Sequence, residues 1–312
     1  MKVVRVVGYH KNLELDEAPE PKVTGPLDVI VKIGAAGVCR VSMIQPEERR
    51  GTTSSNVRLD GHPYPRGATK STNILLSLGN EQMLTESGHT APSGDLWLVH
   101  CLPVWRRRAL RRQPLPRIFR VDAYNHTNSL ATGYAEYLKT TARSVIKLDD
   151  SLEPADVAAL ADAGLTAYHA VAKAAKLLRP GNICVMIGAG GLGHIGVQVM
   201  KAISAAILIV IDSNPDALKL AKDLGADHTV QAGDDGKFVQ EVLDLTKGKG
   251  AEAVIDFVAE GGSTATGVKM LRRAGNYYVV GYGENINVPT IDIISTEINF
   301  VSKARECFVA GH

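Results

Sequence analysis

One glycine-rich segment has the spacing of a phosphate-binding turn. Gly188, Gly190 and Gly193 form a G-x-G-x-x-G pattern, and Gly191 and Leu192 complete the turn. The first glycine permits a tight turn, the second lets the backbone approach a pyrophosphate, and the third lets a helix pack against a strand. The free N–H groups at the start of that helix would bind the phosphates. These five residues are therefore predicted to bind a dinucleotide cofactor.

An acidic residue stands where such a site holds the ribose. Asp212 ends an apolar run, 19 residues after Gly193. An aspartate at this place accepts hydrogen bonds from the ribose 2′- and 3′-hydroxyls and repels a 2′-phosphate. The sequence therefore favours NAD over NADP. A glycine turn with an unrelated acid is the alternative.

Two later residues extend the predicted cofactor site. Val258 follows the strand-like run Ala253–Phe257, and Gly281 follows Tyr277–Val280. Ligands of parallel sheets bind at the carboxyl ends of the strands, so both residues are expected to line the nicotinamide crevice. An ordinary strand-to-helix turn is the alternative for each.

The elements around these residues alternate between strand and helix. Buried strands are expected at 183–187, 207–211, 253–257 and 277–280. Helices are expected at 154–178, 192–205, 215–224 and 238–246. This alternation predicts an α/β fold with a doubly wound parallel sheet, a Rossmann domain that we place at 151–300.

Composition narrows the classes of function. The chain has 312 residues, a net charge of +2 and 45% hydrophobic residues, which suits two globular domains. The near-neutral charge argues against nucleic acid or an acidic membrane as partner, and the sequence has no run of ~18 apolar residues that could span a membrane. Four widely spaced cysteines and the lack of a signal-peptide pattern lead us to expect a cytoplasmic protein without a disulfide framework.

The N-terminal part, 1–150, has a different pattern. Strands are expected at 3–7, 29–33, 134–138 and 145–148. Apolar periodicity fades between 40 and 130, and Val104–Arg120 holds seven arginines and no acid. This block could bind nucleic acid nonspecifically. No recognition motif accompanies it, and a solvated or disordered segment is the simpler interpretation.

Three segments resemble the medium-chain, zinc-dependent alcohol dehydrogenases of the bacterial NAD-dependent type: Gly34–Arg40, Gly133–Tyr137 and Leu160–Tyr168. The resemblance covers roughly 1–40 and 132–300. It implies a GroES-like β-rich catalytic domain at 1–150 joined to the Rossmann domain. It also implies oxidation of an alcohol to an aldehyde or ketone, with hydride transfer to NAD.

The resemblance further implies a catalytic zinc with Cys39 and Asp162 as catalytic ligands. Such a metal is held by three protein ligands, leaves a fourth position open and polarises the substrate oxygen. A buried apolar thiol is the alternative for Cys39. A helix-capping or solvated acid is the alternative for Asp162.

The catalytic half departs from the family pattern. Family members place Gly-His-Glu about thirty residues after the cysteine, where this chain has Gly67–Lys70, and they carry a four-cysteine cluster for a structural zinc that is missing here. His62 is the nearest substitute ligand in the sequence. Codons GGG-GCC-ACG-AAA for Gly67–Lys70 contain Gly-His-Glu in another frame. A frameshift over 41–130 and true divergence are thus both open.

These departures predict impaired catalysis. The family likeness also fails after Phe300, and we expect 301–312 to be a truncated tail. Two alternatives stay open beside the dehydrogenase: a zinc-free quinone reductase-like enzyme, and an NAD-binding remnant without catalysis. Family members pair through the sheet edge near 290–302, which implies a homodimer or homotetramer.

Overall fold

The computed structural model describes residues 1–6, 13–37, 73–77, 96–99, 135–142, 145–233, 236–281, 283 and 285–302. The chain divides into two compact units, Met1–Asp162 and Ala163–His312. Predictions that concern Cys39, His62, Gly67–Lys70 and the arginine block lie outside the described residues.

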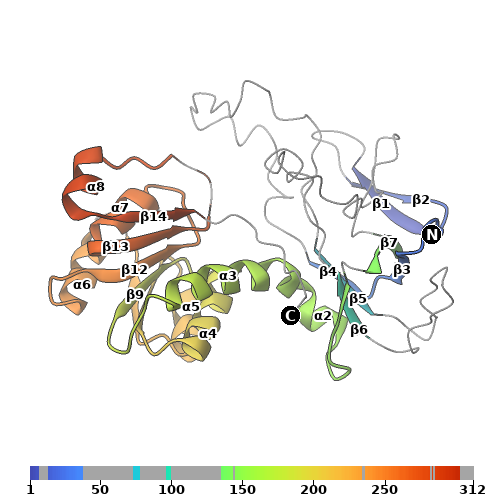
Figure 1. The fold of residues 1–312 in the computed structure, drawn as a ribbon, viewed down its shortest axis with the longest axis horizontal. Helices are drawn as coiled ribbons and strands as arrows, with labels where there is room; N and C mark the ends of the chain where they lie inside the picture. Colours follow the sequence, from blue (N-terminus) through green and yellow to red (C-terminus); the bar gives the residue numbers. More distant parts are fainter. Residues whose placement is uncertain are drawn as a thin grey trace. The chain divides into compact units, whose positions relative to one another are not determined.

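The C-terminal unit is built on one six-stranded sheet (Figure 1). Its strands are β9 (Ile183–Ile187), β10 (Ile207–Asp212), β11 (His228–Gln231), β12 (Ala251–Asp256), β13 (Leu271–Val279) and β14 (Asn299–Ser302). All neighbours pair in parallel, in the order β11-β10-β9-β12-β13-β14. This is the strand order of the Rossmann fold, with the order reversing between β9 and β12. The predicted fold class is confirmed.

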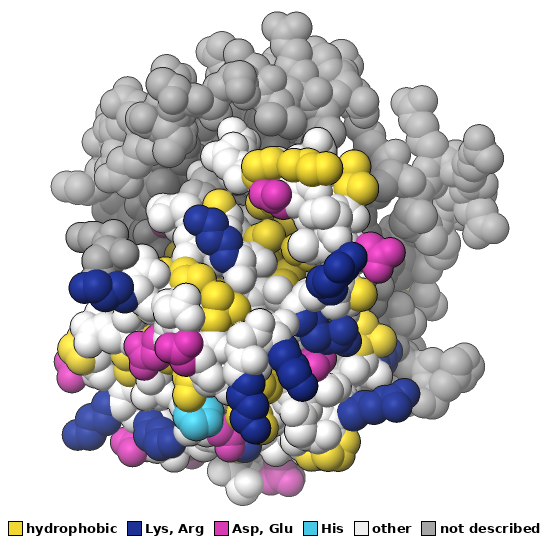
Figure 2. Space-filling model, turned by 90° about the vertical axis from the view of Figure 1, so that its left-hand side faces the viewer, with side chains coloured by type: hydrophobic (Ala, Val, Ile, Leu, Met, Phe, Trp, Pro, Cys, Tyr) yellow, Lys and Arg dark blue, Asp and Glu magenta, His cyan; other side chains and the backbone are white. Residues whose placement is uncertain are grey.

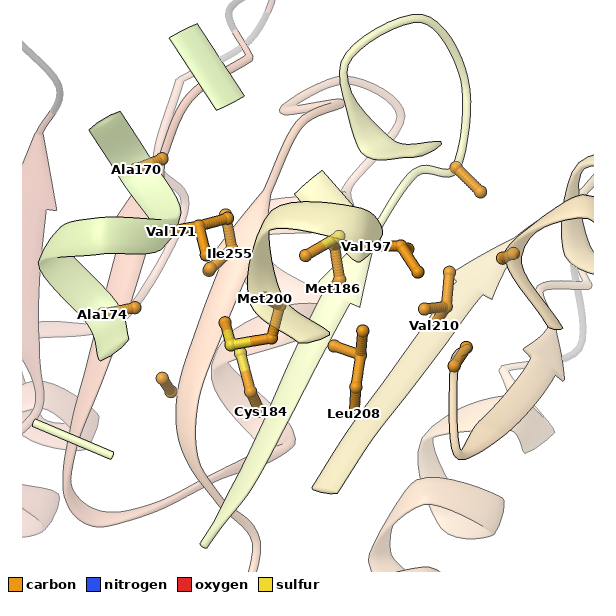
Figure 3. Packing of buried hydrophobic residues seen from close by; sticks show 14 of the residues in the cluster. Ala170, Val171, Ala174, Cys184, Met186, Val197, Met200, Leu208, Val210 and Ile255 are labelled. Carbon is orange, nitrogen blue, oxygen red and sulfur yellow. The ribbon is translucent and has the colours of Figure 1, made fainter. Parts of the chain in front are cut away.

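Helices cover both faces of this sheet. They are α3 (Ala163–Ala175), α4 (Gly193–Ile203), α5 (Pro215–Asp223), α6 (Lys237–Leu245), α7 (Ser263–Lys269) and α8 (Thr290–Thr296). Cys184 and Met186 of β9 pack with residues of α3 and α4, as Figure 3 shows, and with residues of α5. Val185 and Ile187 pack with α6 and α7 on the other face. Strand side chains alternate between faces, so β9 is buried on both sides and is a continuous apolar run.

The N-terminal unit contains only antiparallel pairs among its described strands. β1 (Lys2–Val6) pairs with β2 (Leu13–Glu17), and β3 (Asp28–Lys32) pairs with β7 (Tyr137–Thr141). The remaining strands form a sheet in the order β4 (Ala35–Gly37), β5 (Asn73–Ser77), β6 (Leu96–Val99) and β8 (Val145–Lys147). Two short turns of helix follow, α2 (Pro154–Val157) and the 3₁₀ helix η3 (Ala158–Ala161).

Strands β5 and β6 lie within 40–130, where the apolar periodicity of the sequence fades, and each pairs with one neighbour from outside that stretch. Two local expectations need correction. The strand expected at 134–138 is β7, at 137–141. The single helix expected over 154–178 is interrupted at Asp162, whose backbone (φ −120°, ψ −63°) leaves the helical region. Alanine content favours helix throughout this stretch but does not register such a break.

The surface carries charges of both signs. On the face shown in Figure 2, basic and acidic side chains are interspersed, and hydrophobic side chains gather near the upper edge of its described part. Within the described residues, no helix is long and apolar enough to cross a membrane.

Candidate dinucleotide-binding site

The carboxyl ends of the central strands hold their loops side by side. The N–H of Gly188 donates to the carbonyl of Ile211 at 2.8 Å, and the N–H of Phe257 donates to the carbonyl of Ile187 at 3.0 Å. The N–H of Val280 donates to the carbonyl of Asp256 at 2.9 Å. The sheet ladder thus continues past the strands and places the three loops after β9, β12 and β13 at one edge.

The glycine loop has the space that a pyrophosphate needs. Gly188 has φ +91°, and a Cβ there would stand 2.7 Å from Cγ2 of Val258. A Cβ at Gly193 would overlap the carbonyl oxygen of Gly188, so α4 can begin this close to β9 only with glycine. Among the described residues, a Cβ at Gly190 or Gly191 would meet no atom within 4 Å. This part of the chain therefore leaves the outer side of the loop open and fits a dinucleotide there.

Helix α4 begins at Gly193, the last residue of the glycine pattern. Leu192, at the N-cap, makes no side-chain cap hydrogen bond. The first N–H groups of a helix lack partners within the helix and form a positive end suited to an anion. His194 lies in the same turn, with Nδ1 2.7 Å from the carbonyl oxygen of Gly190. Since that oxygen can only accept, Nδ1 carries the hydrogen. The hydrogen bond that Nδ1 donates fixes the glycine loop to the start of α4.

Asp212 ties the glycine loop to the next βα turn. Its Oδ2 accepts from the N–H of Ala189 at 2.7 Å, and its Oδ1 accepts from the N–H of Asn214 at 2.8 Å. A carboxylate offers about four acceptor positions, so both oxygens can still accept from hydroxyl groups. Asn214 in turn caps α5 by accepting from the N–H of Asp216 at 2.9 Å. The carboxylate is thus held at the end of β10, where a ribose would be recognised.

Val258 and Gly281 meet on the other side of the glycine loop. The Val258 side chain is 36% exposed and stands against Gly188. A Cβ at Gly281 would overlap the Val258 carbonyl, so the two backbones approach closely. The structure therefore brings together the two residues that the sequence placed at the nicotinamide end, Val258 and Gly281.

The sequence places Asp256 at the end of a strand, but its role in organising this side emerges only from the structure. Asp256 is fully buried and accepts four hydrogen bonds, from the N–H groups of Val258 and Ala259 and from the hydroxyls of Ser263 and Tyr277. An acid at the end of an otherwise apolar strand was the available signal. Buried charges are rare unless hydrogen-bonded, so such a residue has a specific task.

The metal-binding predictions rest mostly on residues that are not described. Asp162 is half-buried, and its N–H donates to the carbonyl of Ala159 at 3.3 Å. Within the described ranges, no three His, Cys, Asp or Glu side chains come close enough to hold a metal ion. The described part alone therefore does not form a zinc site. Burial, together with nearby Glu252, raises the pKa of the Cys184 thiol to about 12, so this cysteine is a core residue.

Comparisons with known proteins agree with this architecture. Residues 191–306 match the family model described as zinc-binding dehydrogenase. An NAD-dependent alcohol dehydrogenase of Sulfurisphaera tokodaii is 30% identical over 314 residues, covering 96% of this chain and 84% of the relative. An alcohol dehydrogenase of Geobacillus stearothermophilus is 30% identical, covering 97% of this chain and 83% of that protein.

Solved structures lead to the same family. The crystal structure of the alcohol dehydrogenase from Aeropyrum pernix has a TM-score of 0.71 and 31% sequence identity, covering 97% of this chain and 85% of that one. These matches cover 96–97% of the chain and so include both units. The chain is an oxidoreductase by descent and belongs to the medium-chain alcohol dehydrogenase family.

Proposed function

We propose that the chain binds NAD through its C-terminal unit and is an alcohol dehydrogenase whose zinc-dependent step is impaired. The observation that carries the NAD assignment is Asp212, held by two backbone N–H groups at the end of β10 beside the glycine loop. The NAD-dependent relative from Sulfurisphaera tokodaii supports the same cofactor.

Each part of the site has a distinct role in this proposal. Gly190, Gly191 and Leu192, with the first turn of α4, bind the pyrophosphate. Asp212 accepts from the adenosine ribose and repels a 2′-phosphate. Val258 and Gly281 line the nicotinamide. NAD, when bound, supplies the acceptor for the hydride of an alcohol, and the protein orients it along the edge of the sheet.

The zinc is the weak part of the site. Cys39 and Asp162 stand at family ligand positions, whereas Gly67–Lys70 replaces the segment that carries the histidine. A catalytic zinc needs three protein ligands. With two of them, the chain should bind zinc weakly and oxidise small alcohols slowly, leaving NAD binding as its principal retained property.

Calorimetric titration with NAD and NADP tests the cofactor assignment. The unmutated chain should prefer NAD by about tenfold or more, and Asp212→Ala should weaken NAD more than NADP. Asp216→Ala is the matched control, because it removes a nearby exposed acid from α5 without touching the ribose position. Equal affinities for NAD and NADP in the unmutated chain would overturn the role of Asp212.

We also propose that two copies associate through the edge strand β14. In the described part of the chain, β14 pairs with β13 on one side only. The preceding helix α8 exposes Ile291 and Ile294 at 65% and 71%. Unpaired edges and exposed large apolar side chains favour association. Ile294→Asp should convert a dimer into a monomer by light scattering, and a monomeric unmutated chain would contradict the proposal.

A further inference from the structure

We infer that Asp256 is a positioning residue for the nicotinamide half of the cofactor. Its side chain is fully buried and therefore acts through the loop that its hydrogen bonds hold. The inference rests on the proposed NAD function and deepens it, because it assigns separate carboxylates to the two halves of the ligand.

The first step is the hydrogen bonding of the carboxylate. Oδ1 accepts from the N–H groups of Val258 and Ala259 at 2.8 and 2.9 Å, and Oδ2 accepts from Ser263 Oγ and Tyr277 Oη at 2.8 and 2.7 Å. Hydrogen bonds to a charged acceptor are stronger than neutral ones, so this buried carboxylate fixes its loop firmly.

The second step is the strain in the loop. Ala259 has φ +48°, in the left-handed region that a residue with a side chain rarely adopts. Such conformations persist only where the surroundings impose them, and they cluster at ligand sites. The bond from the Ala259 N–H to Asp256 is one such constraint. Phe257 supplies another constraint, because its ring packs closely against Gly196 of α4. A Cβ built at Gly196 would stand 3.0 Å from the ring atoms Cε2 and Cζ of Phe257.

The third step is where the fixed loop lies. Strand order places β10 and β12 on opposite sides of β9. Asp212 thus stands on one side of the glycine loop, and Val258 stands on the other, against Gly188 and beneath Gly281. A dinucleotide lies across this reversal of strand order. If Asp212 holds the adenosine ribose, the loop that Asp256 fixes faces the nicotinamide half.

The arrangement predicts a selective effect. ADP-ribose contains the adenosine ribose and the pyrophosphate but no nicotinamide. Asp256→Ala should therefore weaken NAD by on the order of tenfold while changing ADP-ribose affinity by less than about twofold. Asp256→Asn should retain most of the NAD affinity, because its amide oxygen can accept the two N–H bonds and the hydroxyls can turn to accept from its NH₂.

Calorimetry on the full chain with NAD and with ADP-ribose is the test. Val242→Ala is the control, because it removes buried methyl groups from α6, outside the loop after β12, and should leave both affinities alike. Ser263→Ala, which removes one donor, replaces Asp256→Ala if that variant does not fold, and should weaken NAD at least twofold with ADP-ribose unchanged. Equal losses, or no loss, for the two ligands overturn the inference. Failure of the unmutated chain to bind either ligand overturns the proposed function as well.

Discussion

The described strands of the two units form sheets of different kinds. In the N-terminal unit, the described strands form three separate sheets, and every described pair is antiparallel. The C-terminal unit encloses its sheet between two continuous clusters of buried side chains, one on each face. The cofactor half therefore has a self-contained core.

This contrast separates binding from chemistry. Every residue that we assign to NAD lies in the C-terminal unit, whereas Cys39 and Asp162 belong to the N-terminal one. In a Rossmann sheet, the loops that bind the cofactor directly follow the strands, at their carboxyl ends. Residues close in the sequence therefore form the cofactor site. A zinc site in the other unit needs ligands that are far apart in the sequence. Changes over 41–130 can thus remove the metal and leave the cofactor bound.

The largest expected effect concerns the metal. The purified chain should hold far less than one zinc per molecule and form NADH from simple alcohols more than about 100-fold more slowly than a family member with three ligands, since even indirect changes around a metal cost 10–100-fold. Metal analysis and NADH absorbance measure both quantities. Ala68→His with Thr69→Glu should not restore activity, because the surrounding segment also differs. Stoichiometric zinc with fast turnover would refute the impairment and make His62 the first candidate for the third ligand.

A substitution in the glycine loop should weaken NAD binding and lower the stability of the C-terminal unit. Gly193→Ala places a Cβ onto the carbonyl of Gly188, so α4 must move away from β9. We expect NAD affinity to fall more than about tenfold and the melting temperature to fall by several degrees, since overpacking costs about 1–3 kcal/mol.

Gly191→Ala is the matched control for the change in stability only, because Gly191 belongs to the proposed pyrophosphate site. Its Cβ would meet no atom of the described residues within 4 Å, so the melting temperature should stay within about 1 °C. Titration calorimetry and thermal unfolding check both variants. Equal melting temperatures for the two would show that the close approach at Gly193 is not required.

The same contrast explains what the sequence could predict. Strands β9, β10 and β12 are buried on both faces, so they are recognisable as continuous apolar runs. The edge strand β11, His228–Gln231, and the helix α7, Ser263–Lys269, have no apolar run and were not predicted. Strands β5 and β6 form by pairing with strands that are distant in the sequence, and local apolar periodicity does not reveal such pairing.

The candidate site divides along the same line. The glycine pattern and Asp212 are local features with fixed spacing, so the sequence could propose them. The role of Asp256 depends on donors from four residues, the last of them Tyr277, 21 positions away. No spacing rule links such donors, because the fold alone brings them together.

The smallest expected effect tests whether the two units unfold separately. Each unit contains a partly buried aspartate paired with a lysine. Oδ2 of Asp28 lies 3.4 Å from Nζ of Lys139, and Oδ2 of Asp227 lies 3.0 Å from Nζ of Lys201. Burial raises the pKa of both carboxyls, but hydrogen bonds and the lysine charge outweigh it, so both pKa values end below 3.8. Each pair thus adds stability above about pH 4, and that stability is lost as the pH falls through the lowered pKa.

Each substitution should therefore move one transition only. Both tryptophans of the chain, at 97 and 105, belong to the N-terminal unit, so their fluorescence reports that unit, whereas helical circular dichroism reports mainly the C-terminal one. At pH 7, Asp28→Asn should lower the urea midpoint seen by fluorescence, and Asp227→Asn the midpoint seen by dichroism. Each loss should stay below about 1 kcal/mol, because solvent screens both pairs. The losses should shrink as the pH falls below about 4 and the native carboxylates become protonated. If either variant moves both transitions equally, the units unfold together, and binding and chemistry cannot be separated in the way that we infer.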